Sequence, residues 1–228
     1  MKELRVSPLR KAIARNLTEG AALPYASCDT AIDATSILPF VKMHDLKIDA
    51  IFLSAISEIV YSKMPQMNVR WIDGETDPNG KTITDPKMLQ YDTLNIGLAM
   101  ESKNGLVVVT IKDVERKNLW QLNSEIKELT AVATAGKLTL RHFEPKPNIV
   151  FNNIGVYPNI INGSPLLLPW NTFMISAFRV VETPVVYKGM IVIRPMMNVK
   201  ITFDHRPLDG KDPAIFLNFL KENVENFR

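Results

Sequence analysis

The stretch ITFDHRPLDG, residues 201–210, holds the residue types whose spacing best suits acid–base chemistry. An apolar, strand-like run ends in Asp204, His205 and Arg206, and Asp209 follows a short Pro–Leu turn. Histidine has an ordinary pKa of about 6.5, so a neutral imidazole can accept a proton near pH 7. We therefore expect His205 to be a general base that acts on an external nucleophile.

The acid of the same stretch is expected to hold the loop. Asp209 comes four residues after His205, but Pro207 lies between them and interrupts a helical turn. The two side chains therefore do not share a helix face, and we expect Asp209 to turn back on the loop that carries His205. The spacing alone also fits an alternative, in which His205 is a hydrogen-bonded residue at a strand end without a catalytic role.

Other chemistries have little support in the sequence. His44, His142 and His205 are far apart and lack HxxxH or CxxC companions, so we expect no metal site. There is no Gly-x-Ser-x-Gly elbow, GxGxxG turn or phosphate-binding GxxxxGK[ST] loop. Cys28 lies in an alternating stretch, which favours a packed thiol over a reactive one. His44 and His142 lie in charged stretches, and we expect both at the surface.

The composition excludes several classes of protein. Of the 228 residues, 46% are hydrophobic and 22% are charged, which is typical of a globular chain and not of a disordered or fibrous one. The net charge of +3 is spread along the chain, so we expect neither a nucleic-acid nor a membrane partner. One cysteine, no apolar run of ~20 residues and no apolar leader predict a soluble protein of the cytoplasm, or of the mitochondrial matrix in a eukaryote.

Apolar periodicity predicts the elements that must position His205. Ser7 and Pro8 mark a helix start, Asn118 and Gln121 resemble a capping box, and Lys188–Gly189 is the expected hairpin turn. Residues 73–87 are the most loop-like, and 105–111 is expected to be covered on both faces. Helical patterns cover 8–20, 34–45, 48–65, 118–136 and, capped by Asp212–Pro213, 212–226; strand patterns cover 24–33, 94–100, 105–111, 147–155, 172–182, 184–195 and 196–203. The sequence predicts one α/β (α+β) domain with a mixed sheet flanked by helices.

Several further motifs occur in a fixed order along the chain. DHRPLDG matches every fixed position of Asp-His-Arg-x-x-Asp-Gly, and SPLRKAIARNL, MPQMN, AGKLT and NNIG fall where one family has similar segments. LNIGLAMESKNGLVVVTIKDVERKNLWQL follows that family closely, with Val109 in place of a proline. The chain resembles the catalytic core of the dihydrolipoamide acyltransferases, the E2 components of 2-oxoacid dehydrogenase complexes, from about residue 5 to about residue 226.

The resemblance implies a fold, an assembly and a reaction. The fold is like that of chloramphenicol acetyltransferase, and homotrimers carry active sites in channels at subunit boundaries, with further assembly of trimers open. His205 would deprotonate the thiol of coenzyme A, and the thiolate would attack the acyl-dihydrolipoamide thioester. Asp209 would hold the loop with Arg10 as its partner, and Asp204 and Arg206 would form structural ion pairs. The lipoyl group would come from a lipoyl domain outside this chain, and the E1 and E3 components would be partners.

Three departures from the family pattern bear on function. Asn152 stands where the family has a serine that donates to the oxyanion, and we expect the Asn152 amide, with Asn153, to donate instead. Trp170 and Asn171 replace a Pro–Glu pair in a loop that shapes the channel, and we expect Trp170 to have a packing role. The sequence lacks the lipoyl and peripheral-subunit-binding domains and a leucine-rich C-terminal anchor, of which Phe227 would be a remnant, so we expect a trimer rather than a closed shell.

Two alternatives to this acyltransferase stay open. A non-catalytic structural core subunit would keep the fold without turnover; His205 and Asp209 argue against it, and Asn152 argues for it. A stand-alone acetyltransferase that uses coenzyme A would act on a small hydroxylated acceptor. Binding of a lipoyl-lysine arm would distinguish the first hypothesis from this last one.

Overall fold

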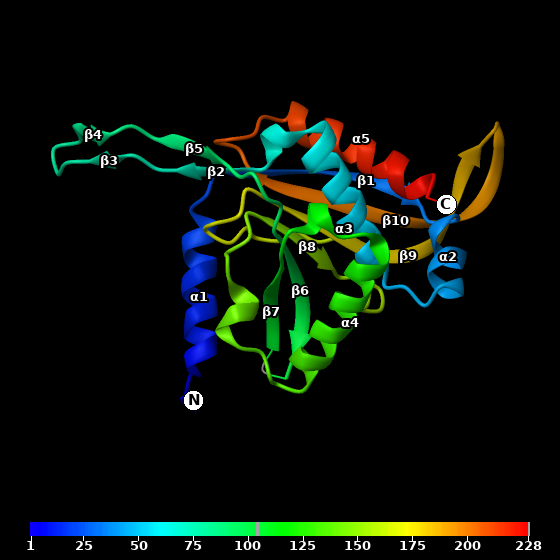
Figure 1. Ribbon diagram of the computed structural model, residues 1–228, viewed down its shortest axis with the longest axis horizontal. Coiled ribbons are helices and arrows are strands. Elements are labelled where there is room, and N and C mark those ends of the chain that lie inside the picture. The colour runs from blue at the N-terminus through cyan, green and yellow to red at the C-terminus, as the bar shows by residue number, and fades with distance from the viewer. Residues whose placement is uncertain (104, 228) are drawn as a thin grey trace.

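A six-stranded mixed sheet forms the centre of the molecule. The computed structural model describes residues 1–103 and 105–227. The strand order is β1-β10-β9-β8-β6-β7 (Figure 1), and β8 runs parallel to both β6 and β9, whereas the other neighbours are antiparallel. The strands are β1 (Tyr25–Asp33), β6 (Ile96–Ser102), β7 (Gly105–Ile111), β8 (Ile149–Asn153), β9 (Phe173–Tyr187) and β10 (Met190–Asp204).

Helices cover one face of this sheet and form the main core with it. Successive strand side chains point to opposite faces, and Phe151, Ile175 and Ile201 are fully buried on the helical side. Phe52 of α3 stacks on Phe151 with ring centroids 5.0 Å apart. The α-helices are α1 (Pro8–Ala21), α2 (Ile37–Met43), α3 (Ile48–Glu58), α4 (Leu119–Thr134) and α5 (Lys211–Glu225), with short turns of other helix types at Ile59–Lys63, Pro65–Met67, Val114–Arg116 and Leu140–Phe143. The predicted mixed sheet flanked by helices is confirmed.

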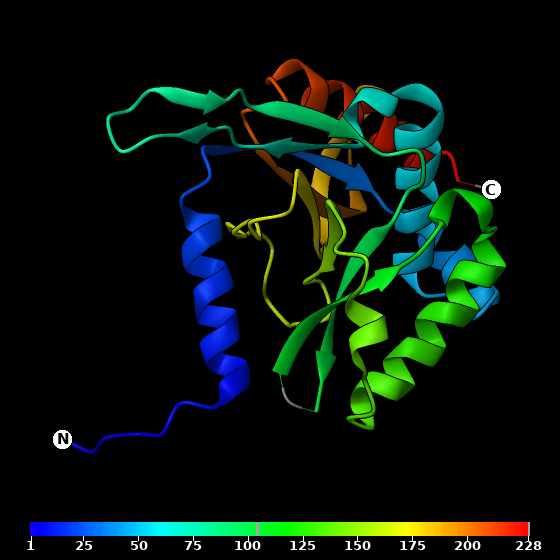
Figure 2. The ribbon, with the colours of Figure 1, turned by 60° about the vertical axis from the view of Figure 1, so that its left-hand side comes forward.

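The opposite face carries a smaller apolar cluster and the helix α1. Val150 of β8 and Met174 of β9 are buried there against Leu167, which belongs to the connection between β8 and β9. In both ribbon views α1 stands beside β7, at the edge of the sheet (Figure 2). Gly20 is the buried residue of its last turn, and a Cβ at this position would lie 1.9 Å from the carbonyl oxygen of Leu167.

Local signals in the sequence predicted three chain reversals and caps correctly. The Ser7 hydroxyl accepts a hydrogen bond from the backbone N–H of Arg10 at 3.2 Å, at the start of α1. Asn118 and Gln121 form the reciprocal capping box of α4. Lys188 and Gly189 join β9 to β10 with positive φ angles of 50° and 79°. A two-residue hairpin turn that matches the twist of its strands requires positive φ at both positions.

The prediction that residues 73–87 form a loop is wrong in part. β2 (Val69–Ile72) pairs with β5 (Lys87–Gln90), and β3 (Glu75–Thr76) pairs with β4 (Thr82–Thr84). Together they form an arm that projects from the body of the molecule (Figures 1 and 2). Turn residues dominate the composition because they cluster at its tip, where the Asp77 carboxylate accepts hydrogen bonds from two backbone N–H groups.

Two further strand predictions need correction. The three segments expected between 172 and 203 are in fact two long strands. Pro184 and Pro195, where the predicted segments begin or end, lie within β9 and β10. β8 pairs with β9 only as far as Ala177 and β1 with β10 only from Met196, so both prolines lie in an outer two-stranded ribbon where a missing N–H is tolerated. β7 is an edge strand and not covered throughout: Leu106 is 56% exposed.

We predict that Gly20→Ala destabilises the chain by about 1–3 kcal/mol, because the added methyl group must displace the backbone at Leu167. Urea unfolding at one fixed protein concentration measures the change. Glu19→Ala is the matched control in the same turn, since its pair with Arg15 is exposed. Equal midpoints for Gly20→Ala and Glu19→Ala would contradict the close contact of α1 with this loop.

Candidate active site

His205 lies directly after β10, at the strand end that the sequence predicted. Its backbone N–H donates a hydrogen bond to the carbonyl of Pro24 at 2.9 Å, which fixes the chain beside the start of β1. Its ring lies 5.3 Å from the ring of Phe203, centroid to centroid, and the side chain is exposed. The imidazole is therefore held at its backbone but open to an incoming group.

Arg206 ties the histidine loop to the arm. Its Nη2 lies 2.6 Å from Oδ2 of the buried Asp204, and its Nη1 lies 2.8 Å from Oδ1 of Asp73, between β2 and β3 in the arm. The hydrogen bonds to Asp204 and then Asp73 raise the pKa of Arg206. The indole N–H of Trp71, followed by Arg206, lowers the pKa of Asp73. The predicted ion pair of Asp204 and Arg206 is confirmed, and it extends to a residue that sequence reasoning left in a loop.

Asp209 holds the other side of the loop. Its Oδ1 accepts a hydrogen bond from the backbone N–H of Lys211 at 2.9 Å, at the first residue of α5. This bond runs forward to α5 and not back toward His205, so the expected contact of Asp209 with the histidine loop stays a prediction. The cap expected at Asp212–Pro213 is wrong: the N-cap residue of α5 is Gly210, which has no side-chain cap, and Asp212 and Pro213 lie in the first turn of the helix. The predicted partner is wrong: among the described residues no ion pair joins Arg10 to Asp209, and Arg10 lies on α1 beside β7. Sequence order gave no information on that distance.

Asn152 lies near the end of β8, between Ala99 of β6 and Ser176 of β9. It is half-buried, and its side-chain amide forms no hydrogen bond with any described residue, so the N–H groups are free to donate. Asn153 is different: its Nδ2 lies 3.4 Å from a carboxylate oxygen of Asp49, and its Oδ1 accepts from the backbone of Gly155. Asn153 is already engaged and supports the strand end.

A cavity of about 490 Å³ opens at this end of β8. Asn152 lines it together with Asp49 from the first turn of α3. Burial raises the pKa of the Asp49 carboxyl above its ordinary value, with the hydrogen bond from Asn153 acting in the opposite direction. Sequence reasoning missed Asp49; its one signal was an acid that precedes a strongly apolar helix.

The chain does not bring His205 and Asn152 together. Asn152 is level with Ser176, and Ser176 is level with Lys200 of β10, five residues before His205. Five residues at ~3.3 Å each and two strand spacings of ~4.8 Å give a separation of about 19 Å between backbones. One reacting carbonyl cannot lie within hydrogen-bond distance of both side chains of the same chain.

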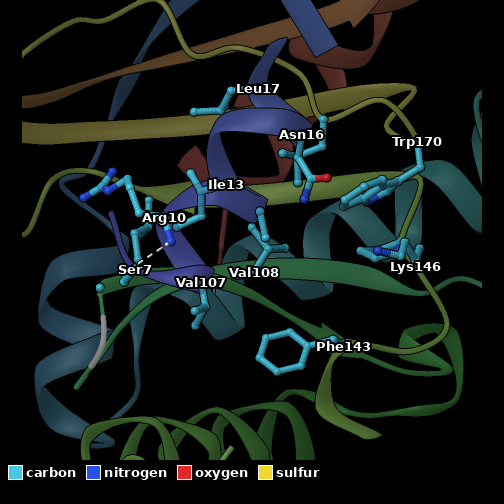
Figure 3. A pocket seen from close by; sticks show the side chains of 15 residues that line it. Ser7, Arg10, Ile13, Asn16, Leu17, Val107, Val108, Phe143, Lys146 and Trp170 are labelled. Carbon is cyan, nitrogen blue, oxygen red and sulfur yellow. Dashed lines mark hydrogen bonds between the residues drawn. The ribbon is translucent and has the colours of Figure 1, made fainter. Parts of the chain in front are cut away.

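A second cavity of about 550 Å³ lies between α1 and β7 (Figure 3). Lys146 lies over the ring of Trp170, with Nζ 3.9 Å from the centroid, and both face this cavity from the side opposite α1. Asn171 is buried, and its side chain donates to the carbonyl of Pro147 at 2.8 Å. The packing role expected of Trp170 fits this position.

The family model of the 2-oxoacid dehydrogenases acyltransferase (catalytic domain) matches residues 1–228. The chain belongs to this family. A relative named as the lipoamide acyltransferase component of a branched-chain alpha-keto acid dehydrogenase complex, from Pseudomonas aeruginosa, is 30% identical over 77% of this chain and 38% of that protein. A dihydrolipoyllysine-residue succinyltransferase component from Bos taurus is 30% identical over 83% of this chain and 39% of that protein.

Solved structures agree with this family. A probable dihydrolipoamide acetyltransferase from Listeria monocytogenes superposes with a TM-score of 0.83 at 26% identity and covers 99% of this chain and 94% of that one. A chloramphenicol acetyltransferase shares the fold, with a TM-score of 0.52 at 16% identity over 100% and 99% of the two chains. The expected fold is confirmed. The chain spans less than two fifths of each curated relative just named, at 38% and 39% of their lengths.

The described residues contain neither a metal-ligand cluster nor a membrane-spanning helix. In residues 1–103 and 105–227, no three His, Cys, Asp or Glu side chains gather as ligands of a metal ion would. Over the same residues, no helix has both the length and the apolar character that crossing a bilayer requires. His44 is exposed against Phe40 and Trp120, and His142 hydrogen-bonds Thr139 in a short turn.

We predict that Arg206→Met lowers the free energy of unfolding by about 3–5 kcal/mol, because it leaves the buried Asp204 carboxylate without its partner. Asp73→Asn breaks only the exposed ion pair of Arg206 with Asp73 and is expected to change the free energy of unfolding by ~1 kcal/mol or less. Equilibrium denaturation of both variants tests the ranking. Similar losses would show that the arm, not Asp204, dominates the energetics of the loop.

We also predict that Asp49→Asn stabilises the chain at neutral pH. The folded pKa of Asp49 is raised, so its folded state is favoured by protonation, and that contribution is present below the unfolded pKa of about 3.9 and lost as pH rises through the folded pKa. The advantage of the neutral amide should be full above the folded pKa and vanish toward pH 3–4. A stability difference independent of pH, measured by urea unfolding across this range, would contradict it.

Proposed function

We propose that this chain transfers an acyl group between dihydrolipoamide and coenzyme A, as the catalytic core of a 2-oxoacid dehydrogenase complex. The observation that carries the proposal is the exposed imidazole of His205 on a loop fixed from three sides, in a chain of this family. Pro24 holds its backbone, Arg206 holds the preceding residue and Asp209 holds the following helix. Such fixed geometry is what a general base needs.

The chemistry needs a base because a free thiol has a pKa of about 8.5 and is mostly protonated near neutrality. His205 takes the proton of the coenzyme A thiol, and the sulfur attacks the carbonyl carbon of acyl-dihydrolipoamide. The tetrahedral intermediate places negative charge on the former carbonyl oxygen, toward which the Asn152 amide donates. When the intermediate collapses, the dihydrolipoamide sulfur leaves and takes the proton from His205. Asp209 acts only through the loop.

We propose that each site is shared between two subunits of a homotrimer. The separation of about 19 Å between His205 and Asn152 leaves each chain with half a site. Each half lies at accessible surface, and α1 and the edge of β7 leave apolar side chains exposed for a neighbouring copy. The outer ribbon of β9 and β10 adds more such surface at Val186, Ile191 and Ile193, which are 70–81% exposed.

The remaining parts of the proposal concern the whole complex. Residues 1–228 would act as one catalytic domain, and the lipoyl group would be presented by a lipoyl domain outside this chain. Coenzyme A would be the second substrate, and the E1 and E3 components would be partners, with assembly beyond the trimer open. The cytoplasm, or the mitochondrial matrix in a eukaryote, would be the setting, since relatives include bacterial and mitochondrial proteins.

A structural subunit without turnover is the second candidate. Asn152 favours it, since an amide stands where the family has a serine hydroxyl. The Asn152 side chain favours catalysis instead, because its amide has no partner among the described residues and its N–H groups are available to a ligand.

Acyl transfer to free dihydrolipoamide from acetyl-, succinyl- and isobutyryl-coenzyme A tests the proposal. We expect His205→Ala to lower kcat by ~10²–10⁴-fold and Asn152→Ala by ~10²–10³-fold, with the oligomer intact. Absence of turnover by the folded native protein on all three thioesters would favour the structural subunit.

Mixed trimers test the shared site. When His205→Ala and Asn152→Ala chains are assembled together in equal amounts, about a quarter of the sites regain both native groups if these come from different subunits. Trimers of either variant alone are the control. Activity that stays at the level of the controls would place both groups in one subunit and overturn the shared site.

A further inference from the structure

A row of polar side chains crosses the sheet on the face opposite the main core. Asn152, Ser176 and Lys200 are level with one another on β8, β9 and β10. Their neighbours along the strands, among them Phe151, Ile175 and Ile201, belong to the core, so strand alternation turns the row toward the other face. Thr202 follows on the same face of β10. The row starts at Asn152, which lines the cavity of about 490 Å³; Ser176 and Lys200 are not among the residues that line this cavity.

The polar groups of this row lack partners. The hydroxyls of Ser176 and Thr202 are buried, with residue exposures of 0% and 1%, and form no hydrogen bond among the described residues. Lys200 is 9% exposed, and in the part of the chain that the structure describes its ammonium has neither an ion pair nor a hydrogen bond. Buried polar groups normally have a partner in the protein, an ordered water or a ligand, so several unpaired groups in one row favour a bound polar group.

The charge of the row specifies what it would bind. All its side chains can donate, and Lys200 is the cation among them. Asp204, further along the same face, is already paired with Arg206. Asp29 lies across from Lys200 on β1, but it is exposed and forms no ion pair with Lys200 among the described residues. Donors and an unneutralised cation in a desolvated row favour an anion with several acceptor oxygens, such as a carboxylate.

We propose that Lys200, with Ser176, binds the terminal carboxylate of an ω-carboxyacyl group of about four carbons, such as succinyl, and so sets the acyl specificity of this chain. The proposal rests on the proposed function, since it places the thioester carbonyl at Asn152. Two strand spacings separate the Cα atoms of Asn152 and Lys200 by about 10 Å. A succinyl chain spans ~4 Å between its terminal carbons and, with a hydrogen bond at each end, bridges roughly 10 Å between donors.

Binding without an acceptor tests this specificity separately from turnover. Calorimetry of succinyl- and isobutyryl-coenzyme A with the assembled protein, in the absence of dihydrolipoamide, compares native chain, Lys200→Met, Lys200→Arg and Ser176→Ala. We expect Lys200→Met to raise the Kd for succinyl-coenzyme A by ten- to a hundredfold and the Kd for isobutyryl-coenzyme A by less than ~3-fold. Lys200→Arg should keep most of the preference for succinyl- over isobutyryl-coenzyme A. Ser176→Ala breaks no existing hydrogen bond and should raise the Kd for succinyl-coenzyme A a few-fold.

The controls separate this inference from the proposed reaction. Lys137→Met makes the same chemical change at an exposed position and should alter neither Kd. Equal losses for both thioesters, or no loss, in a folded Lys200→Met protein would overturn the carboxylate site while leaving acyl transfer untouched. Conversely, a native chain without turnover that still prefers succinyl-coenzyme A through Lys200 would contradict the reaction and retain the binding site.

Discussion

The hydrogen-bond register of the central sheet is the constraint on which the rest of the structure depends. Antiparallel pairing of β9 with β10 and parallel pairing of β8 with β9 set Asn152 level with Lys200 and leave His205 five residues beyond it. A shift by one residue would turn the buried side chains of a strand to the wrong face, so this spacing is fixed by the core. The separation of His205 from Asn152 is therefore a property of the fold, and the proposed site that uses both side chains requires a second chain.

Given that constraint, the histidine loop must be rigid before any partner arrives. In the proposed shared site His205 meets its substrate at a subunit boundary, so its own chain must hold the loop in place beforehand. Arg206 meets this need with donors to Asp204 and Asp73, and planar guanidinium geometry loses little freedom for each bond formed. The same pairing couples the arm to the loop. The most loop-like sequence of the chain thus supports the histidine, an association that only the tertiary structure reveals.

The sequence predicted those structural features that depend only on residues close together in the chain. The cap at Ser7, the capping box at Asn118 and the turn at Lys188–Gly189 each depend on a few adjacent side chains, and all are confirmed. The motif placed His205 at a strand end for the same reason. The ion pair expected between Arg10 and Asp209 failed because it depends on the distance between elements about 200 residues apart. The continuity of two long strands was missed because each contains a proline. Proline is tolerated in the outer part of these strands, where its missing N–H is not needed, but not in a central strand.

The polar row was invisible for a further reason: no single strand contains it. In the sequence, Lys200 is a polar residue within a strand pattern and Asn152 is a departure from a motif. The strand register places them level with one another, and their burial sets them apart from surface residues. An unpaired buried hydroxyl costs about 1–3 kcal/mol, and a packed core would favour removing it. Proteins retain such local conflicts mainly at functional sites, where stability is exchanged for binding. The unpaired hydroxyls of Ser176 and Thr202 lie on the face of the sheet that carries the row from Asn152 to Lys200, and in the proposed site the acyl group extends along that row.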